Sequence, residues 1–468
     1  MKKIYLLILI LIVWNTNYGQ NPIELSEPSQ FTDWIGFIDG YNVCSLSPEK
    51  IIIAYSKGNS WDGRLKVGVI QNDNTIEYGE VSIFSQEGGL YIELAALSDN
   101  KFFLMYKENV NLFVRAGKVI NGNQIILGNA IQIDPTQQIG DISITTLHGD
   151  TAIIAYHDSD QGVCRVLETD ESLDITIGSD YYFTNTTFSN SESLSIDALS
   201  DSSFVVAYNH WFGNVKIGTI NNSNQIAFSP FTEFNNDDSY NIDVVGLQEN
   251  KFAIAFMDEN NVYKGTLVIG TKNSNNQVTY SNKYVFNEES TFAISALKLN
   301  ANEVVIGYTK SDPIIGLSGH LFSSHINDND VQFSEPVIFN ENGINGGVTP
   351  LTHLVDQKFI VQYADYDNFP GYVRIGEADH FLDTTTNEYH LDYAIYTNPH
   401  KNQLIVETLK TGLAFSLELF DINGRLIHKS EYKTKNYVSI DLNNFQSGVY
   451  IVRLKDEKNI ITKRILIK

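Results

Sequence analysis

The amino-acid sequence predicts an all-β protein, and two regularities along the chain are the reason. First, an aromatic residue closes a short apolar run seven times, and successive copies lie 48 to 55 residues apart. Second, apolar runs alternate with polar turns between these residues, and helical periodicity is absent. The repeated aromatics are Tyr55, Tyr106, Tyr156, Tyr208, Phe256, Tyr308 and Tyr363. A strand-only repeat of about 50 residues is typical of a β-propeller or a β-solenoid.

Every copy of the repeat has the same inner pattern. In the second copy we expect strands over residues 91–97, 101–106, 112–120 and 124–133, the last two joined by the turn Asn121-Gly122-Asn123. Four short strands with tight turns match one propeller blade, whereas the coils of a solenoid are usually shorter. The sequence therefore predicts a seven-bladed β-propeller with four-stranded blades over residues 20–380.

The two ends of the repeat region predict how the ring closes. The seventh copy contains only three strands, and the missing fourth strand has a counterpart at the start of the chain. Residues 23–31 (IELSEPSQF) match residues 331–339 (VQFSEPVIF), which form the fourth strand of the sixth copy, with the Glu-Pro pairs in register. We therefore expect an N-terminal strand to close the last blade, which removes an exposed sheet edge.

Residues 1–19 have the pattern of a signal peptide. Lys2 and Lys3 precede an apolar run over residues 5–14, which is too short to span a membrane, and cleavage is expected near Gly19. The alternative is a buried N-terminal strand. No later segment has about 18 continuous apolar residues, so we expect no transmembrane segment in the mature chain.

Charge separates the chain into regions. The net charge is −24 overall, but residues 389–468 carry +4 and the first nineteen residues +2, so residues 20–388 carry −30. This balance argues against a nucleic-acid partner, whose phosphates it repels, and is compatible with cation binding. Cys44 and Cys164 occupy different positions in the repeat, so a disulfide between them is doubtful.

Residues 392–468 depart from the repeat, and the polar, Thr-rich residues 381–391 before them are typical of a linker. Short strands are expected over 404–409, 416–420, 437–441, 449–455 and 460–467, which suits a small β-sandwich. Four motifs occur in this region in the order Thr397-Asn398-Pro399, Asp421-Ile422-Asn423-Gly424-Arg425, Ser447-Gly448-Val449-Tyr450 and the basic apolar end 462–468.

These four motifs together resemble the type A C-terminal sorting domain of the Bacteroidetes type IX secretion system, with Thr397 in place of the family's first Pro. The resemblance assigns the sorting motif to Asn398, Pro399, Asp421, Gly424, Arg425, Gly448 and Tyr450. It implies recognition by the type IX secretion machinery and passage through the periplasm and the outer membrane. The protein would then be secreted or kept at the cell surface. An ordinary β-sandwich binding module is the alternative.

A ligand site is predicted on one face of the propeller. The connections between second and third strands and between blades lie on one face, and they are the longer and more varied loops. Three of the four Trp residues fall in them, beside Asp, Asn and His, a mixture that suits stacking on sugars and bonding of their hydroxyls. The ligand-binding candidates are Trp34, Trp61, Asp62, His210, Trp211 and Tyr366. The alternative is that these aromatics fill gaps between blades.

Signals for metal binding and catalysis are weaker. Asp158 with Asp160, and Asp365 with Asp367, offer oxygen ligands at alternate positions, so Ca²⁺ is the one cofactor considered, against solvated turns as the alternative. His157 and His210 both follow the repeat aromatic and are the candidates for an acid–base pair, with two ordinary polar loop residues as the alternative. The sequence contains none of the common catalytic motifs.

The sequence thus favours an exported, non-enzymatic propeller that binds a glycan or a surface protein. Two other functions stay open. One is a polysaccharide lyase or glycosidase with its site on the Trp-bearing face, and the other is a structural protein of the cell envelope.

Overall fold

The computed structural model describes residues 23–36, 40–58, 60–133, 140–157, 161–184, 193–312, 316–327, 330–340, 343–344, 349–366, 368–379, 393–398, 403–408, 414–421, 425–433, 437–442, 445–446, 448–455 and 460–467. The chain divides into two compact units, Met1–His380 and Phe381–Lys468, and each is described by itself. In the part of the chain that is described, no helix is long and apolar enough to cross a membrane.

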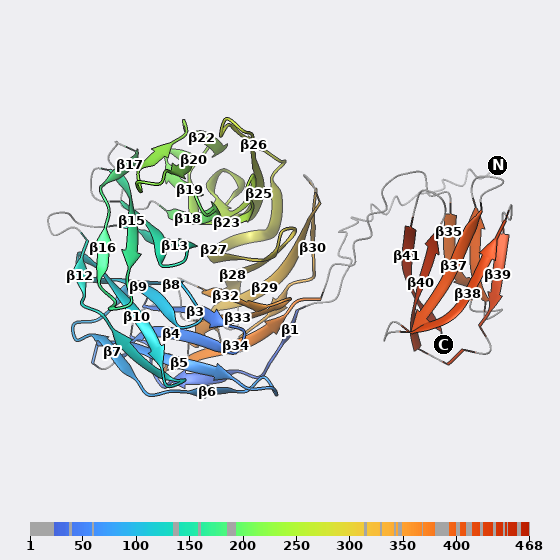
Figure 1. Cartoon of the computed structure of the whole chain (residues 1–468), viewed down its shortest axis with the longest axis horizontal. Helices are drawn as coiled ribbons and strands as arrows, with labels where there is room; N and C mark the ends of the chain where they lie inside the picture. The colour runs from blue at the N-terminus through green and yellow to red at the C-terminus, as the bar shows by residue number, and fades with distance from the viewer. Residues whose placement is uncertain are drawn as a thin grey trace, which may run out of the picture. The chain divides into compact units, whose positions relative to one another are not determined.

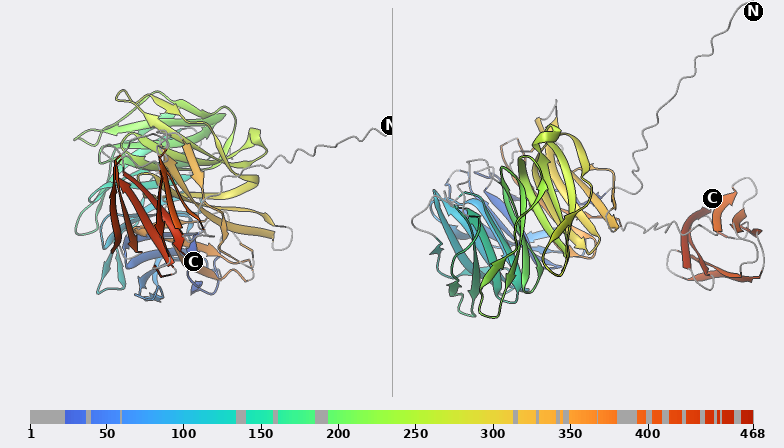
Figure 2. Two further views of the ribbon diagram at one scale, coloured as in Figure 1. Left: turned by 90° about the vertical axis from the view of Figure 1, so that its right-hand side faces the viewer. Right: turned by 90° about the horizontal axis from the view of Figure 1, so that it is seen from above.

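The first unit is a seven-bladed β-propeller, as the sequence predicts (Figure 1). Six antiparallel sheets surround a central axis, since blades 5 and 6 share one sheet, and the strands of each blade run between two faces of the ring (Figure 2). The first four blades have separate sheets. Blade 1 contains β3 (Tyr41–Ser47), β4 (Lys50–Ser56), β5 (Gly63–Ile70), β6 (Ile76–Tyr78) and β7 (Ser82–Ser85). Blade 2 contains β8 (Leu90–Ala96), β9 (Lys101–Glu108), β10 (Asn111–Ile120), β11 (Gln124–Leu127) and β12 (Ile131–Gln132). Blade 3 contains β13 (Ile142–His148), β14 (Thr151–His157), β15 (Gly162–Thr169), β16 (Ile175–Ile177) and β17 (Tyr181–Thr184). Blade 4 contains β18 (Leu194–Ser200), β19 (Ser203–His210), β20 (Phe212–Ile220), β21 (Ile226–Phe228) and β22 (Thr232–Asn235).

The remaining blades share strands or use the start of the chain. Blade 5 contains β23 (Ser239–Gln248), β24 (Lys251–Asp258), the short 3-10 turn η1 (Glu259–Asn261), β25 (Lys264–Lys272) and β26 (Val278–Tyr280). The long strand β27 (Tyr284–Asn300) pairs with β25 and then continues as the inner strand of blade 6. Blade 6 adds β28 (Glu303–Asp312), β29 (Gly316–Asn327), β30 (Asp330–Phe333) and β31 (Val337–Ile338). Blade 7 contains β32 (Leu351–Val355), β33 (Lys358–Ala364) and β34 (Gly371–Glu377), completed by β1 (Glu24–Leu25) and β2 (Ser29–Thr32).

The ring closes as the sequence predicts. Glu24 and Leu25 of β1 pair with Glu377 and Gly376 of β34, and Ser29 of β2 lies opposite Val373. The first and last parts of the repeat region therefore share one sheet, which leaves the seventh blade without an unpaired outer strand.

The outer strand differs from the prediction in one respect, because every blade splits it into two short pieces. A Ser or Gly sits at the break, and its backbone N–H still donates to the third strand, for example Ser26 to Ile375 and Ser334 to Ser323, at 2.8 and 2.9 Å. In both blades the Ser Oγ also accepts the N–H of that same third-strand residue. The matched Glu-Pro pairs follow these serines, where proline's missing N–H interrupts the ladder.

Neighbouring blades are joined by a repeated aromatic contact. A Phe in or directly after the second piece of the outer strand packs against the repeat aromatic of the next blade, as Phe31 does edge-on against Tyr55 (5.3 Å between centroids) and Phe84 against Tyr106 (4.8 Å). The same ring covers the glycine that begins the third strand, and a Cβ on Gly162 would come within 2.3 Å of Phe183. The regular aromatic of the repeat is thus explained by packing between blades.

The second unit is a small β-sandwich, also as predicted. One sheet has the order β35 (Tyr393–Asn398), β36 (Gln403–Thr408), β39 (Tyr437–Asp441), and the other β38 (Leu426–Tyr432), β37 (Phe415–Asp421), β40 (Gly448–Lys455), β41 (Ile460–Ile467). Leu417, Val438 and Val452 are among the apolar side chains that fill its core. The sequence reading missed β35 and β38.

Candidate functional site

Exposed apolar side chains are concentrated on one face of the propeller. We call this the aromatic face: it carries the connections from second to third strands and from each blade to the next. Its exposed apolar residues are Trp34, Trp61, Tyr91, Val110, Trp211, Phe212, Val262, Tyr263, Phe292 and Tyr366. The opposite face, which carries the other turns, exposes only Val355 among the large apolar residues that the structure describes there. Grouped exposed apolar side chains are a common feature of interaction surfaces.

Trp34 and Trp61 belong to one cluster on blade 1. The Gly58 N–H donates to the Trp34 carbonyl (3.3 Å), and the Trp61 N–H donates to the Lys57 carbonyl (2.9 Å). The Trp34 indole lies directly over Gly58, where a Cβ would approach it to 2.5 Å. Trp34 is 37% exposed and Trp61 is 49% exposed, so both keep a large part of the ring accessible.

Tyr366 continues this cluster onto blade 7. Its ring lies edge-on to Phe369 at 6.4 Å, and the Phe369 carbonyl accepts a hydrogen bond from the Ile35 N–H at 2.8 Å, next to Trp34. The structure therefore brings together three of the predicted ligand-binding residues, Trp34, Trp61 and Tyr366, along the boundary between blades 7 and 1.

The Asp62 side chain is buried and holds a loop, so it is not exposed to solvent on the aromatic face. It is only 5% exposed, and its carboxylate pairs with the Arg64 Nε at 2.9 Å and accepts a bond from Ser60. Burial opposes its ionisation, but the bonds from Ser60 and Arg64 outweigh burial and hold the pKa of Asp62 below its ordinary value. Its role is to hold the loop that carries Trp61.

Trp211 stands on blade 4, separate from the first cluster. It is 75% exposed and lies at the tip of the β19–β20 hairpin, where His210 pairs with Phe212. The His210 ring meets the indole edge-on at 6.2 Å, and burial lowers the pKa of His210. The predicted residues thus form two aromatic clusters on different blades.

Two of the three exposed tryptophans, Trp61 and Trp211, have a backbone conformation that is unfavourable for a bulky residue. Trp61 has φ of 61° and Trp211 has φ of 63°, in the left-handed region that suits Gly or Asn. At the matching connection of blade 2 the residue is Asn109, with φ of 55°. Bulky residues in this conformation cost of the order of 1–2 kcal/mol, and such strain clusters at functional sites.

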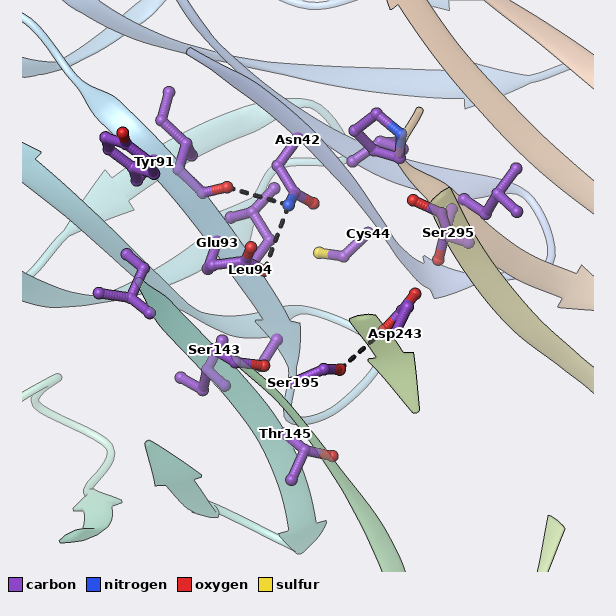
Figure 3. Close-up of a pocket in the computed structure, with 18 of the residues that line it drawn as sticks. Asn42, Cys44, Tyr91, Glu93, Leu94, Ser143, Thr145, Ser195, Asp243 and Ser295 are labelled. Carbon is purple, nitrogen blue, oxygen red and sulfur yellow. Dashed lines mark hydrogen bonds between the residues drawn. The ribbon is translucent and has the colours of Figure 1, made fainter. Parts of the chain in front are cut away.

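A central pocket of about 550 Å³ lies between the inner strands of the blades. It is the feature that the sequence reasoning missed. Side chains from different blades converge on it, and Figure 3 labels among others Asn42, Glu93, Ser143, Ser195, Asp243 and Ser295. Tyr91, Asp141 and Asn241 line it where the inner strands begin, which is the end toward the aromatic face.

Three of the pocket residues are placed by β-bulges. The pairing register shifts between Leu90 and Glu93, between Tyr240 and Asp243, and between Phe292 and Ser295. Each bulge contains a non-glycine residue with positive φ, namely Tyr91 (48°), Asn241 (48°) and Ala293 (50°). Bulges occur next to functional sites because they redirect the following side chain.

Some of the acidic groups near the axis join neighbouring blades. Asp243 accepts bonds from the Ser195 hydroxyl of blade 4 and the Ala296 N–H of blade 6, both at 2.7 Å. Asp197 similarly accepts bonds from Thr145 (2.8 Å) and the Gly246 N–H (2.7 Å). Burial raises the pKa of Asp243 to about 6 despite these bonds, and the negative charge of Asp197 adds to the rise.

The Glu93 carboxyl accepts fewer hydrogen bonds than the carboxylates of Asp243 and Asp197 do. Among the described residues, its carboxyl has one hydrogen-bond donor, the Asn42 amide at 3.3 Å. Burial, followed by the negative charge of Asp243, raises the pKa of Glu93 to about 8, and Asp141 contributes to the rise. At neutral pH this carboxyl is therefore mostly protonated when the pocket is empty.

The two histidines are not brought into the central pocket. His157 ends β14, packs against Gly140 and is buried; burial and the nearby Lys107 lower its pKa to about 4. His210 ends β19 on the next blade. Neither residue lines the pocket, which is surrounded by carboxyl, hydroxyl, amide and apolar groups.

The proposed calcium ligands fall largely outside the described residues. Asp158, Asp160 and Asp367 are not described. Asp365 is buried, and its carboxylate accepts a bond from the Tyr366 N–H at 3.2 Å. Another group of three carboxylates, Asp237, Asp238 and Glu259, has oxygens within 4.8 Å of one another, among the residues that the structure covers. Tyr240 and Tyr263 both donate to Glu259, and this group carries no assignment here.

Most of the described sorting residues lie at the ends of strands of the sandwich, whereas Tyr450 lies within an inner strand. Asp421 accepts the Arg425 N–H (2.9 Å) and pairs with its Nε (3.1 Å). Tyr450 is buried and donates to the Gln446 carbonyl at 3.0 Å, in β40, which begins at Gly448. Asn398 ends β35, while Pro399 and Gly424 are outside the described residues.

A signal for the pocket was present in the sequence. The residue thirteen positions before each repeat aromatic falls on the inner strand or, in blade 7, directly before it. These residues are Asn42, Glu93, Ser143, Ser195, Asp243, Ser295 and Pro350. Six of the seven are polar, although they lie in otherwise apolar strands. Aligning the copies at this position would have identified the pocket lining.

Comparison with known proteins identifies the second unit. The family model described as the secretion system C-terminal sorting domain matches residues 394–468. This confirms the resemblance inferred from the four motifs. A sorting domain of this type implies export by the type IX machinery, with secretion or placement at the cell surface.

The propeller is similar to several solved structures at low sequence identity. No curated protein matches the chain. Among solved structures, it is similar to a periplasmic gluconolactonase of Pseudomonas aeruginosa, with 10% identity and TM-score 0.48 over 86% of this chain and 99% of the other. It is also similar to AofleA from Arthrobotrys oligospora (8%, TM-score 0.44, 68% and 93%) and to the WD40 domain of SCAP from fission yeast (10%, TM-score 0.39, 76% and 98%). Likenesses this distant carry no functional argument.

Proposed function

We propose that this chain is an exported binding protein that holds a glycan on the aromatic face of its propeller. Residues 1–19 act as the signal peptide, residues 20–380 as the binding unit and residues 381–391 as the linker. Residues 392–468 then direct the chain from the periplasm across the outer membrane. The binding unit is thereby delivered to the medium or to the cell surface.

The observation that carries the proposal is the left-handed backbone at the two most exposed tryptophans. Gly or Asn at residues 61 and 211 would relieve strain, and neither indole is needed to fill the core, since Trp61 is 49% and Trp211 is 75% exposed. Stability alone therefore gives no reason for Trp at these positions. A large, rigid, exposed aromatic plane is the group that stacks on a pyranose ring.

Binding is favoured over catalysis by the placement of the candidate acid–base residues. His157 is buried beside Lys107, and His210 is on the next blade beside Trp211. Asp243 has both carboxylate oxygens engaged by neighbouring blades. None of these groups is arranged to transfer a proton to a substrate held between them.

A glycan array probed with the purified mature chain tests the proposal. Trp61→Ala and Trp211→Ala should each weaken binding about tenfold or more, the usual effect of removing an anchoring aromatic. Tyr182→Ala and Phe231→Ala are matched controls, because both side chains are exposed on the outer edge of the ring rather than on the aromatic face. They should leave binding unchanged.

Two results would contradict the proposal. One is an absence of glycan binding by the wild type, which would favour a protein ligand or a structural role in the envelope. The other is glycan binding that both tryptophan variants retain in full, which would mean that the glycan binds away from these two side chains.

A further inference from the structure

The central pocket has a one-sided electrostatic character. Glu93, Asp141 and Asp243 line it, whereas no Lys, Arg or His is among the described residues that line it. It lies in a region of the chain with a large negative charge. A pocket of this kind repels anions and concentrates cations.

The pocket suits an extended ligand better than a bare metal ion. A chelated ion needs several oxygens converging within a few ångströms. In the part of the chain that is described, the one trio of that kind is Asp237, Asp238 and Glu259, which is outside the pocket. The volume of about 550 Å³ is instead in the range of pockets that hold small organic molecules.

Glu93 is the group available to receive such a ligand. Asp243 already accepts bonds on both oxygens, whereas Asn42 is the single donor to Glu93 among the described residues. The bulge at Tyr91 and Ile92 directs the Glu93 side chain into the pocket, and the labelled side chains in Figure 3 show this convergence. The strained backbone that achieves this placement argues for a role beyond packing.

We infer that the central pocket binds the ammonium group of an amino sugar, so that the glycan held on the aromatic face carries free amines. The inference rests on the proposed function and specifies its ligand. An ammonium has three donors, which match the Glu93 carboxylate and hydroxyls such as those of Ser143 and Ser295. Tyr91 is both exposed on the aromatic face and part of the pocket lining, so one ligand can contact both regions.

Binding of the ammonium group then removes the proton from the Glu93 carboxyl. In the empty pocket Glu93 is mostly protonated at neutral pH, because burial and the facing carboxylates of Asp243 and Asp141 disfavour its charge. Lys107 is the nearby cation, and it acts on Asp141. When the ammonium enters, the Glu93 carboxyl loses its proton to the buffer and becomes the counter-ion. Binding should release up to one proton.

Isothermal titration of the mature chain tests the inference with two probes, a β-1,4-linked glucosamine trimer and its fully N-acetylated form. The amine trimer should bind about tenfold more tightly or better, as expected for a charge-assisted contact. Glu93→Gln should remove this preference by weakening binding of the amine trimer. Glu249→Gln, at an exposed turn of the opposite face, is the control and should behave as the wild type.

The outcomes separate this inference from the proposed function. Equal affinity for the two trimers, or no binding of the amine trimer, overturns the inference, while binding of other glycans on the array still supports the proposed function. If the wild type binds no glycan at all, both the inference and the proposed function are overturned. Titration of the wild type in two buffers of different ionisation enthalpy gives a test that needs no variant. Release of up to one proton supports the inference, and no release contradicts it.

Discussion

The Asn42 amide donates a 3.3 Å hydrogen bond to the Glu93 carboxyl, from the inner strand of blade 1 to that of blade 2. The two residues occupy the same position in successive copies of the repeat, thirteen residues before Tyr55 and Tyr106. A single neutral donor compensates only part of the cost of burying a carboxylate. The pKa of Glu93 therefore rises from its ordinary value of 4.5 to about 8.

This shift predicts that Glu93 destabilises the fold at high pH. Between pH 4.5 and about 8 the unfolded chain loses the proton while the folded chain keeps it, so stability falls as pH rises through this window. Glu93→Gln should raise the free energy of unfolding at pH 8, by an amount of the order of 2–4 kcal/mol. The gain should vanish below pH 4.5. Urea unfolding at a series of pH values measures it, and a pH-independent difference would contradict the assignment.

Replacement of Trp211 should separate stability from binding. Asn tolerates the positive φ at this position better than Trp does, so Trp211→Asn should be as stable as the wild type or more stable by about 1 kcal/mol. Trp211→Ala removes the same ring but keeps the strain and should be less stable than the Asn variant. Both variants should lose glycan binding. Thermal unfolding and a binding assay decide, and a clear loss of stability in the Asn variant would mean that the indole has a packing role.

The sequence predicts the architecture well because packing between blades recurs at a fixed period. Tyr55, Tyr106 and their counterparts are buried against a Phe of the neighbouring outer strand, so each copy repeats the same pattern. The closing strand was predictable for the same reason, since Ser26 makes the contacts in blade 7 that Ser334 makes in blade 6.

The binding surface was only partly predictable. Exposed tryptophans in the loops are visible in the sequence, but Asp62 looks equally accessible there and is in fact buried against Arg64. The pocket depends on β-bulges that shift the pairing register before Glu93 and Asp243, and the local sequence pattern does not predict these bulges. His157 follows the repeat aromatic by one residue and His210 by two. Successive side chains of a strand point to opposite faces, so His157 is buried while His210 is only half-buried.

Gln362 is expected to weaken the fold. It is fully buried, and neither amide atom has a hydrogen-bond partner among the residues that the structure describes. The same repeat position holds Ala in several other blades, including Ala54 and Ala155. Gln362→Leu should raise the free energy of unfolding by about 1–3 kcal/mol, the cost of an unsatisfied buried group. Gln357→Leu is the matched control and should lower it, because the Gln357 amide donates to buried Glu303 at 2.6 Å. A loss of stability in both variants would show that water satisfies Gln362.

Removal of residues 394–468 should stop export without unfolding the propeller. The sorting domain has its own core, with Leu417 and Val452 fully buried, and the propeller closes its ring without it. The truncated chain should accumulate inside the outer membrane and still bind glycans. Cell fractionation and a binding assay of the retained protein test this. Normal appearance of the truncated chain outside the cell would contradict the assigned route.

The role of the N-terminal strand in closing the ring can be tested with a matched pair of variants. Phe31 packs on Tyr55 and Gly371, and Phe339 packs on Tyr363 and Gly319 in the same way, so each Phe→Ala change should cost about 3–5 kcal/mol. Phe31 differs from Phe339 because it lies in the N-terminal strand, which is joined covalently to the ring at one end only, through blade 1. Loss of that anchor should release β1 and β2 from β34, which exposes a sheet edge.

Limited proteolysis under native conditions distinguishes the two variants. Phe31→Ala should be cut rapidly within residues 23–32 and should aggregate more readily than the wild type, whereas Phe339→Ala should keep this segment protected despite a similar loss of stability. The difference follows because residue 339 lies within a continuous stretch that is tied to the ring at both ends. Equal protection of the N-terminal strand in both variants would mean that β1 and β2 hold the ring through their backbone pairing alone, without the Phe31 anchor.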